Sequence, residues 1–110
     1  MPKPDSLQGS LDLLILKILK GRPGLHGYAL MVAIKEFSDD VLRVEEGSLY
    51  PALHRLEMDG SVKAAWITRA GTGRRARTYE LTAHGRKQLA AEESRWQTVT
   101  AAVNRVLRMA

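Results

Sequence analysis

The sequence predicts a mainly α-helical fold with one small β-hairpin. Three observations predict it. In the first half of the chain, apolar residues recur at the three- and four-residue spacing of helices that bury one face. Two segments with β-branched and aromatic residues, at 62–68 and 77–81, flank a loop that holds Gly71 and Gly73. No proline follows Pro51, and residues 82–109 are rich in good helix formers, which favours a long terminal helix.

Composition narrows the possible classes of protein. A chain of 110 residues suits a single globular unit. Seventeen Lys and Arg against twelve Asp and Glu give a formal charge of +5, which permits a polyanionic partner. Cysteine is absent, so disulfides and thiolate sites are excluded. Residues 1–5 lack the apolar region of a signal peptide, and residues 11–19 are too short and too charged to span a bilayer. We therefore expect a soluble, cytoplasmic protein.

The first two helices are expected at residues 11–20 and 27–37. Ser10 is the expected N-cap of the first, and the segment 21–24 ends it with two glycines and a proline. A turn at 38–40 and an extended linker at 41–44 follow the second helix. The expected buried positions are Leu11, Leu14, Ile15, Ile18 and Leu19 in the first helix and Tyr28, Leu30, Met31 and Ile34 in the second.

A third helix is expected between residues 47 and 59, with Gly60 as its stop. Leu49, Leu53 and Leu56 form a narrow apolar stripe at helical spacing. The remaining surface carries side chains suited to hydrogen bonding with phosphates and base edges, namely Ser48, Tyr50, His54 and Arg55. Two helices joined by a short polar segment, the second with such a face, are typical of a helix-turn-helix with a DNA recognition helix.

The hairpin that follows is expected to have a basic tip. No acidic residue lies between positions 63 and 77. Trp66, at the base of the hairpin, is expected in the core. The basic residues in and after this region are Lys63, Arg69, Arg74, Arg75, Arg77, Arg86 and Lys87.

The terminal helix is expected to start after Thr82, its N-cap, and to end near residue 109. Its apolar residues repeat at heptad spacing, and no later element is available to cover them. A second copy of the chain is the simplest partner, because closed two-fold pairing buries the stripe on both copies. The residues assigned to this homodimer interface are Leu89, Trp96, Val99, Val103 and Val106.

Several separated motifs, in the right order, resemble the PadR family of bacterial transcriptional regulators. They are the Gly-Ser-Leu-Tyr-Pro-Ala-Leu run at 47–53 with Arg-Leu-Glu at 55–57, Leu-Asp-Leu-Leu-Ile-Leu at 11–16, His-Gly-Tyr at 26–28, Trp66, and Tyr-Glu-Leu-Thr-Ala-His-Gly-Arg at 79–86. The resemblance spans about residues 7 to 96. It implies a winged helix-turn-helix DNA-binding domain at residues 1–81 and a C-terminal dimerisation helix at residues 82–110.

The resemblance also implies a function. We expect a sequence-specific transcriptional regulator, most simply a repressor, that binds double-stranded DNA at a pseudo-palindromic operator as a homodimer. The family usually has two tyrosines on the second wing strand, whereas this chain has Thr78 before Tyr79. The expected DNA-binding residues are Ser48, Tyr50, Pro51, His54, Arg55, Lys63, Arg69, Arg74, Arg75 and Arg77.

Trp96 allows two interpretations. It is either a packing residue of the dimer core or a stacking platform for a small planar aromatic effector, since some family members bind flat apolar ligands at the dimer centre. For the whole chain, the alternative to a regulator is a winged-helix adaptor that binds proteins without sequence-specific DNA binding. Catalysis has little support: His26, His54 and His84 fall in different elements and lack metal-ligand spacing. We expect no cofactor, no metal and no membrane partner.

Overall fold

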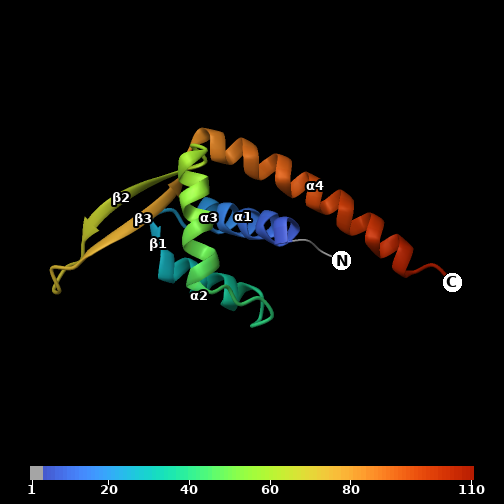
Figure 1. Cartoon of the computed structure of the whole chain (residues 1–110), viewed down its shortest axis with the longest axis horizontal. Helices are drawn as coiled ribbons and strands as arrows, with labels where there is room; N and C mark the ends of the chain where they lie inside the picture. The colour runs from blue at the N-terminus through green and yellow to red at the C-terminus, as the bar shows by residue number, and fades with distance from the viewer. Residues whose placement is uncertain (1–3) are drawn as a thin grey trace.

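The computed structural model describes the backbone of residues 4–110 and the side chains from residue 10 onward. Part of the N-terminal segment 1–5, where no signal peptide is expected, therefore lies outside the described residues. The elements are α1 (Pro4–Gly21), β1 (Leu25–His26), α2 (Gly27–Phe37), α3 (Glu46–Met58), β2 (Val62–Thr68), β3 (Arg75–Leu81) and α4 (Ala83–Leu107). Figure 1 shows a helical body of α1, α2 and α3, from which the β2–β3 hairpin extends on one side and α4 on the other. The predicted mainly helical fold with a small β-hairpin and a long terminal helix is confirmed.

The first helix is longer than expected and buries a wider face. It begins at Pro4, so Ser10 lies inside α1 and the predicted N-cap is wrong. A proline suits the first position of a helix, where its missing N–H is not needed. Leu16 is fully buried although it was not on the expected apolar face. The reason is that α1 contacts α2, α3 and α4, so more than one side of it is covered.

The second helix matches its predicted bounds, but one expected core residue is exposed. Leu30 and Ile34 are buried and Met31 is partly buried, as predicted. Tyr28 is 64% exposed, because it lies in the first turn of α2 at the edge of the body, where no other element covers it. The predicted turn follows α2 and carries two residues with positive φ, Asp39 and Asp40.

The sheet has three antiparallel strands in the order β1-β3-β2. Strand β2 has the predicted bounds, and β3 begins two residues earlier than predicted. Strand β1 was not predicted, because two residues carry no alternating pattern that a sequence could reveal. Leu25 and His26 pair with Tyr79 and Thr78 of β3, which ties the start of α2 to the hairpin.

Trp66 lies on the exposed part of this hairpin, so its predicted place in the core is wrong. It is 57% exposed and is paired with Arg77 across the two strands. Val62 and Leu81, at the other end of the hairpin, are buried against the helices. The hairpin projects beyond the helical body, so its outer half has no layer to cover an aromatic ring (Figure 1).

A compact corner joins α3, both hairpin strands and α4. The Thr82 side chain caps α4 by accepting a hydrogen bond from the Gly85 N–H at 3.0 Å, as predicted. The Thr82 hydroxyl also donates to the Gly60 carbonyl oxygen at 2.5 Å, and the Thr82 N–H donates to the Ser61 carbonyl oxygen at 3.1 Å. A Cβ on Gly85 would lie 2.0 Å from that same Ser61 oxygen. The corner therefore excludes any side chain at position 85.

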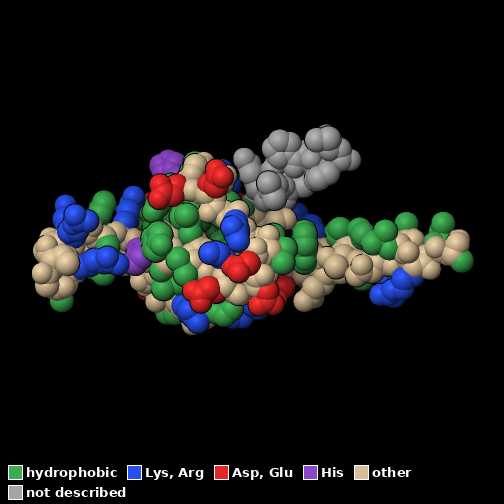
Figure 2. All heavy atoms as spheres, turned by 90° about the horizontal axis from the view of Figure 1, so that it is seen from below, with side chains coloured by type: hydrophobic (Ala, Val, Ile, Leu, Met, Phe, Trp, Pro, Cys, Tyr) green, Lys and Arg blue, Asp and Glu red, His purple; other side chains and the backbone are tan. Residues whose placement is uncertain are grey.

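The long helix α4 has a buried base and an exposed end. Leu89 is 2% exposed and packs in the core of its own chain, so it adds no free surface to the predicted dimer stripe. Lys17 of α1 pairs with Glu93 at 3.2 Å, and α4 then runs away from the body. Figure 2 shows hydrophobic side chains along one edge of the projecting helix. The large exposed apolar residues of α4 beyond Glu93 are Trp96, Val99, Val103, Val106 and Leu107, and Met109 follows the helix.

The boundary between the two expected domains is not marked by a separate core. The first turns of α4 pack against α1 and β3, and Leu89 belongs to the same hydrophobic cluster as Leu53 and Leu56. The division at residues 81 and 82 therefore stays a prediction. Within the described residues, no helix is long and apolar enough to cross a membrane.

The close contact at Gly85 predicts that a side chain at this position lowers the stability of the fold. Gly85→Ala should lower the free energy of unfolding by about 2 kcal/mol or more, because the added methyl group must displace the Ser61 backbone. Gly21→Ala is the matched control, since a Cβ at this other helical glycine meets nothing within 4 Å. Urea unfolding of both variants measures the difference. Equal stability of the two variants would contradict the close contact at the corner.

Candidate nucleic-acid interface

Helix α3 separates its residues onto a buried face and an exposed face. Leu49, Leu53 and Leu56 are fully buried, which confirms the predicted stripe. At about 100° per residue, Pro51 and His54 lie opposite that stripe, and both are exposed. Two flanks remain, and the predicted contact residues divide between them: Tyr50 lies on the flank toward the hairpin, and Ser48 and Arg55 on the flank toward α1.

Tyr50 rests on the start of α2. A Cβ on Gly27 would lie 2.7 Å from the Tyr50 ring, so the ring packs directly against the backbone at this position. Tyr50 as a whole is still 43% exposed, which leaves it available to a partner. Tyr50 and Gly27 border a shallow pocket of about 300 Å³ between α2, α3 and the hairpin. The other residues that line it include His26, Tyr28, Arg69, Arg77 and Tyr79.

The Arg55 side chain is paired with a carboxylate of its own chain. Its Nη2 lies 3.1 Å from Oδ1 of Asp12 on α1, and both side chains are partly buried. Asp12 engages only Nη2, so a contact between Arg55 and DNA would have to use its other N–H groups or compete with Asp12. The predicted role of Arg55 in DNA binding therefore has less support than that of His54.

The pair is not a strong source of stability. Burial raises the pKa of Asp12 above its ordinary value of 3.8, although the Arg55 charge and hydrogen bond act to lower it; the charges of Asp59 and Glu92 add to the increase. Desolvation, together with the repulsion from Asp59 and Glu92, thus outweighs the attraction of Arg55 for the ionised carboxylate. Ionised Asp12 costs free energy in the folded state.

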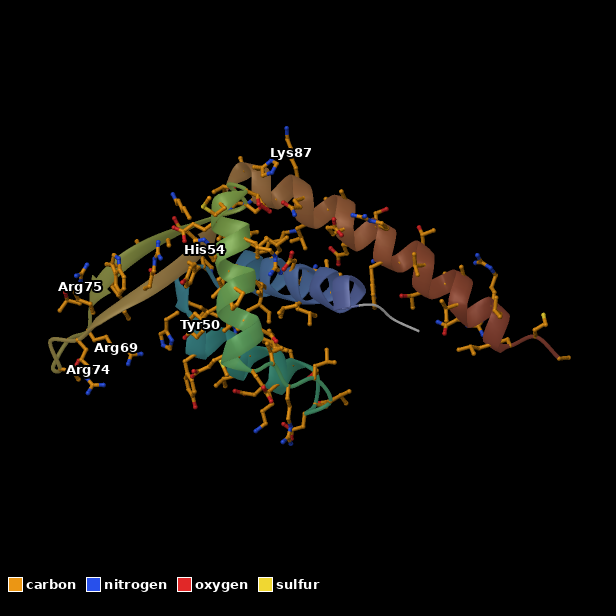
Figure 3. The ribbon with its side chains drawn as sticks, in the orientation of Figure 1. Tyr50, His54, Arg69, Arg74, Arg75 and Lys87 are labelled. Atoms are coloured by element: carbon orange, nitrogen blue, oxygen red, sulfur yellow. The ribbon has the colours of Figure 1, made fainter. Side chains whose placement is uncertain are left out.

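The hairpin β2–β3 with its loop 69–74, hereafter the wing, presents three exposed arginines. Figure 3 shows Arg69, Arg74 and Arg75 at its outer end, with Tyr50 and His54 along the side of α3 nearer the wing in this view. The Arg75 guanidinium lies 4.7 Å from the centre of the Trp66 ring, a cation–π distance. Trp66 thus supports an arginine on the wing instead of filling the core.

The other two predicted cations of the wing are paired with carboxylates. Arg77 Nη2 lies 2.6 Å from Oε2 of Glu57 on α3, so this residue fixes the wing to the end of the recognition helix. Lys63 lies 3.0 Å from Glu80, its cross-strand neighbour, and both of these side chains are exposed. An exposed pair of this kind contributes little stability and leaves the lysine able to exchange partners.

The basic cluster of the sequence does not form one patch. Lys87 lies on the first turns of α4, at the opposite end of the wing from the arginines of its tip (Figure 3). The arginines of the tip and the exposed residues of α3 are the candidates for a single surface. The pairing roles of Asp12 and Glu57 have no signal in the sequence, because the partners lie 43 and 20 residues away in the chain. No group of three His, Asp or Glu side chains that could hold a metal occurs in the described part of the chain.

This arrangement, a helix-turn-helix followed by a basic wing and a long terminal helix, matches known proteins. The model of the "Transcriptional regulator PadR-like family" matches residues 15–91. The chain belongs to this PadR-like family. It is thus a transcriptional regulator of a winged-helix family, which implies regulation through DNA binding.

Solved structures of PadR-like proteins and other regulators are similar over almost the whole chain. A transcriptional regulator from Clostridium thermocellum is 25% identical with a TM-score of 0.82, and the match covers 96% of this chain and 97% of that one. A PadR-like regulator from Bacillus cereus is 26% identical, with a TM-score of 0.80 and coverage of 96% and 99%. A putative regulator from Thermoplasma acidophilum has the same identity and TM-score, with coverage of 94% and 96%. The long terminal helix thus falls within the matched length.

The Asp12–Arg55 pair generates a prediction about pH. Because the folded-state pKa of Asp12 is raised, the folded protein binds more protons than the unfolded chain between pH 3.8 and that raised value. The contribution of Asp12 to stability therefore falls as pH increases through this window and stays unfavourable at neutral pH. Asp12→Asn should remove that decrease and leave the free energy of unfolding at pH 7 unchanged or slightly higher.

Urea unfolding from pH 3 to pH 7 tests the prediction. Lys17→Gln is a suitable control, because it breaks the exposed pair with Glu93 without altering Asp12. A loss of more than about 1 kcal/mol at pH 7 for Asp12→Asn would mean that the pair is net stabilising.

Proposed function

We propose that this PadR-like protein binds a pseudo-palindromic operator as a homodimer and represses transcription. One observation carries the proposal: the exposed face of α3, centred on Pro51 and His54, lies beside a wing with three exposed arginines. The helix would enter the major groove, and the wing would contact the neighbouring phosphates. His54 and Tyr50 are the residues we assign to base reading, and Arg69, Arg74 and Arg75 those we assign to the backbone.

The exposed apolar residues of α4 support pairing of two chains. The projecting part of this helix leaves Trp96, Val99, Val103 and Val106 exposed, and each of these side chains has half or more of its surface in solvent. Such a continuous apolar edge is a mark of an interaction surface. A second copy of the chain supplies the same edge, so two-fold pairing buries both at once. The two recognition helices would then read two half-sites.

Release by a small planar effector is the regulatory part of the proposal. Trp96 is 51% exposed, and in a two-fold pair through α4 the two indole rings would approach the dimer centre. A flat aromatic ligand stacked there would alter the crossing of the two helices. It would weaken operator binding only to the extent that it binds the two states with different affinity.

The recognition helix is tested with selected DNA. Selection from a random pool should yield one preferred, two-fold symmetric site. On that site, Tyr50→Ala or His54→Ala should cost about 1–3 kcal/mol of binding free energy, with a much smaller loss on random DNA. Lys87→Ala is the control, because Lys87 lies away from the candidate surface.

The same measurement separates a regulator from an adaptor. Affinity that falls steeply with salt, together with a large preference for the selected site, supports the regulator. Weak binding that is indifferent to sequence would contradict the proposal and favour a winged-helix adaptor that contacts an acidic protein. Locating the preferred site relative to promoters would then distinguish repression from activation.

The proposed dimer interface on α4 is tested by placing charged residues in it. Val99→Glu combined with Val103→Glu should convert the dimer to monomer, because pairing would bury four unpaired carboxylates. Gln97→Glu with Ala101→Glu adds the same charge to exposed positions on the other side of α4 and should leave the dimer intact. Sedimentation equilibrium measures both. A stable dimer in both double variants would exclude this interface.

The effector is tested by fluorescence. In the Trp66→Phe protein, Trp96 is the sole tryptophan, so a planar aromatic compound that stacks at the dimer centre should quench the emission and reduce operator affinity. A panel of planar compounds should be titrated with and without operator DNA. Unaltered fluorescence across the panel, with the dimer intact, would make Trp96 a packing residue alone.

A further inference from the structure

His26, in the His-Gly-Tyr segment at the start of α2, makes two contacts with its imidazole ring. Nδ1 accepts a hydrogen bond from the Ala29 N–H at 3.2 Å, which caps the helix. Nε2 lies 2.8 Å from Nη2 of Arg69 on the wing. Each contact has the length of a hydrogen bond.

The two contacts are not compatible as hydrogen bonds. A guanidinium has only donors, and so does a backbone N–H, so each contact requires its imidazole nitrogen to accept. A neutral imidazole has one accepting nitrogen, and an imidazolium has none. When Nδ1 accepts from the Ala29 N–H in the helix cap, the proton is on Nε2. The Nε2–H of His26 and the Nη2–H of Arg69 are then two donors that meet without an acceptor between them.

Glu36 of α2 lines a second shallow pocket together with His26 and Arg69, but it forms no ion pair with Arg69 among the described residues. None of the ion pairs among the described residues involves Arg69, whereas Arg55, Lys63 and Arg77 each have an acidic partner. Arg69 is exposed, and it borders the shallow pocket between α2, α3 and the wing together with His26 and Tyr50. In Figure 3 it lies between the tip of the wing and Tyr50. No acceptor of the chain is in place between the two nitrogens, so one from a bound partner can fill that position.

We propose that His26 and Arg69 together bind one phosphate of the DNA backbone. A phosphate oxygen placed between Nε2 and Nη2 accepts from both, and its negative charge offsets the guanidinium. Binding of DNA thus removes a donor–donor conflict that exists in the free protein. His26 becomes a DNA-contact residue, and the cap on α2 fixes its tautomer so that Nε2 donates. The inference rests on the proposed DNA-binding function and adds a residue that the sequence did not assign to it.

The variant His26→Asn isolates the second donor. Asparagine is a good N-cap, so its side-chain oxygen can accept from the Ala29 N–H while the donor at the Nε2 position is lost. The melting temperature should stay within about 2 °C of the original. Affinity should fall about 3- to 10-fold on the preferred site and on random DNA alike, because a phosphate carries no sequence information.

A double-variant cycle tests whether the two residues share one phosphate. Arg69→Ala alone should weaken binding by a similar factor, and the loss in the His26→Asn, Arg69→Ala protein should be smaller than the product of the single losses. Arg74→Ala is the matched control: it lies on the same wing, and its effect should multiply with that of His26→Asn. If both pairs multiply, His26 and Arg69 do not act on one phosphate, and the proposal is wrong.

Nitrogen NMR of the ring tests the tautomer in the unaltered protein. The free protein should show the Nε2–H tautomer of His26, and DNA should shift that signal and slow exchange of its proton. A free protein with the proton on Nδ1 would make the Arg69 contact an ordinary hydrogen bond and overturn the proposal. Titration with inorganic phosphate is the second arm: saturable binding at His26, with no further change on adding DNA, would assign the site to a free anion instead.

These outcomes also separate the inference from the function on which it rests. If the unaltered protein shows no salt-dependent DNA binding, the proposed function fails. If DNA binds and Arg74→Ala weakens it, but His26→Asn and Arg69→Ala do not, the function stands and the assignment of this phosphate contact is wrong.

Discussion

The close approach of Gly85 to the Ser61 carbonyl is the constraint on which the rest of the molecule depends. Around this contact the end of α3, the start of β2, the end of β3 and the first turn of α4 meet within a few residues. Thr82 satisfies the carbonyls of Gly60 and Ser61 while capping α4, so the corner has a hydrogen-bonded geometry as well as a steric one. The recognition helix, the wing and the terminal helix therefore take their mutual directions from one small junction.

Much of the fold is predictable from local pattern, and its exceptions have a common cause. The stripe of Leu49, Leu53 and Leu56 and the cap at Thr82 follow from spacing and side-chain type alone. Trp66 and Leu89 are placed wrongly, in opposite senses, because a sequence does not show which neighbour covers a residue. The hairpin extends past the helices and exposes the indole, whereas α1 lies against the base of α4 and buries the leucine. Strand β1 is too short to have a period at all.

The candidate site also has features that the sequence predicts and features that depend on which residues the fold brings together. Counting basic residues correctly locates a cationic wing, yet it overstates how many cations are available. Arg55, Lys63 and Arg77 face Asp12, Glu80 and Glu57, two of which come from elements distant in the sequence. The sequence shows His26 in the His-Gly-Tyr motif and as a histidine without metal-ligand spacing, whereas its contact with Arg69 requires β1 to lie beside β3. The electrostatic character of the surface is thus a tertiary property, although its raw charge is a sequence property.

The projecting helix has a mechanical consequence. Its base is clamped by Leu89 and by the Lys17–Glu93 pair, and beyond Glu93 it continues without support to Leu107. With a rise of about 1.5 Å per residue, that free arm is about 20 Å long. A change of about 10° in its direction would move the far end by ~3.5 Å, which is close to the rise of about 3.4 Å between successive bases on a DNA strand. In the pair proposed above, a change of this size in the direction of α4 would therefore shift one recognition helix relative to the other by about one base step.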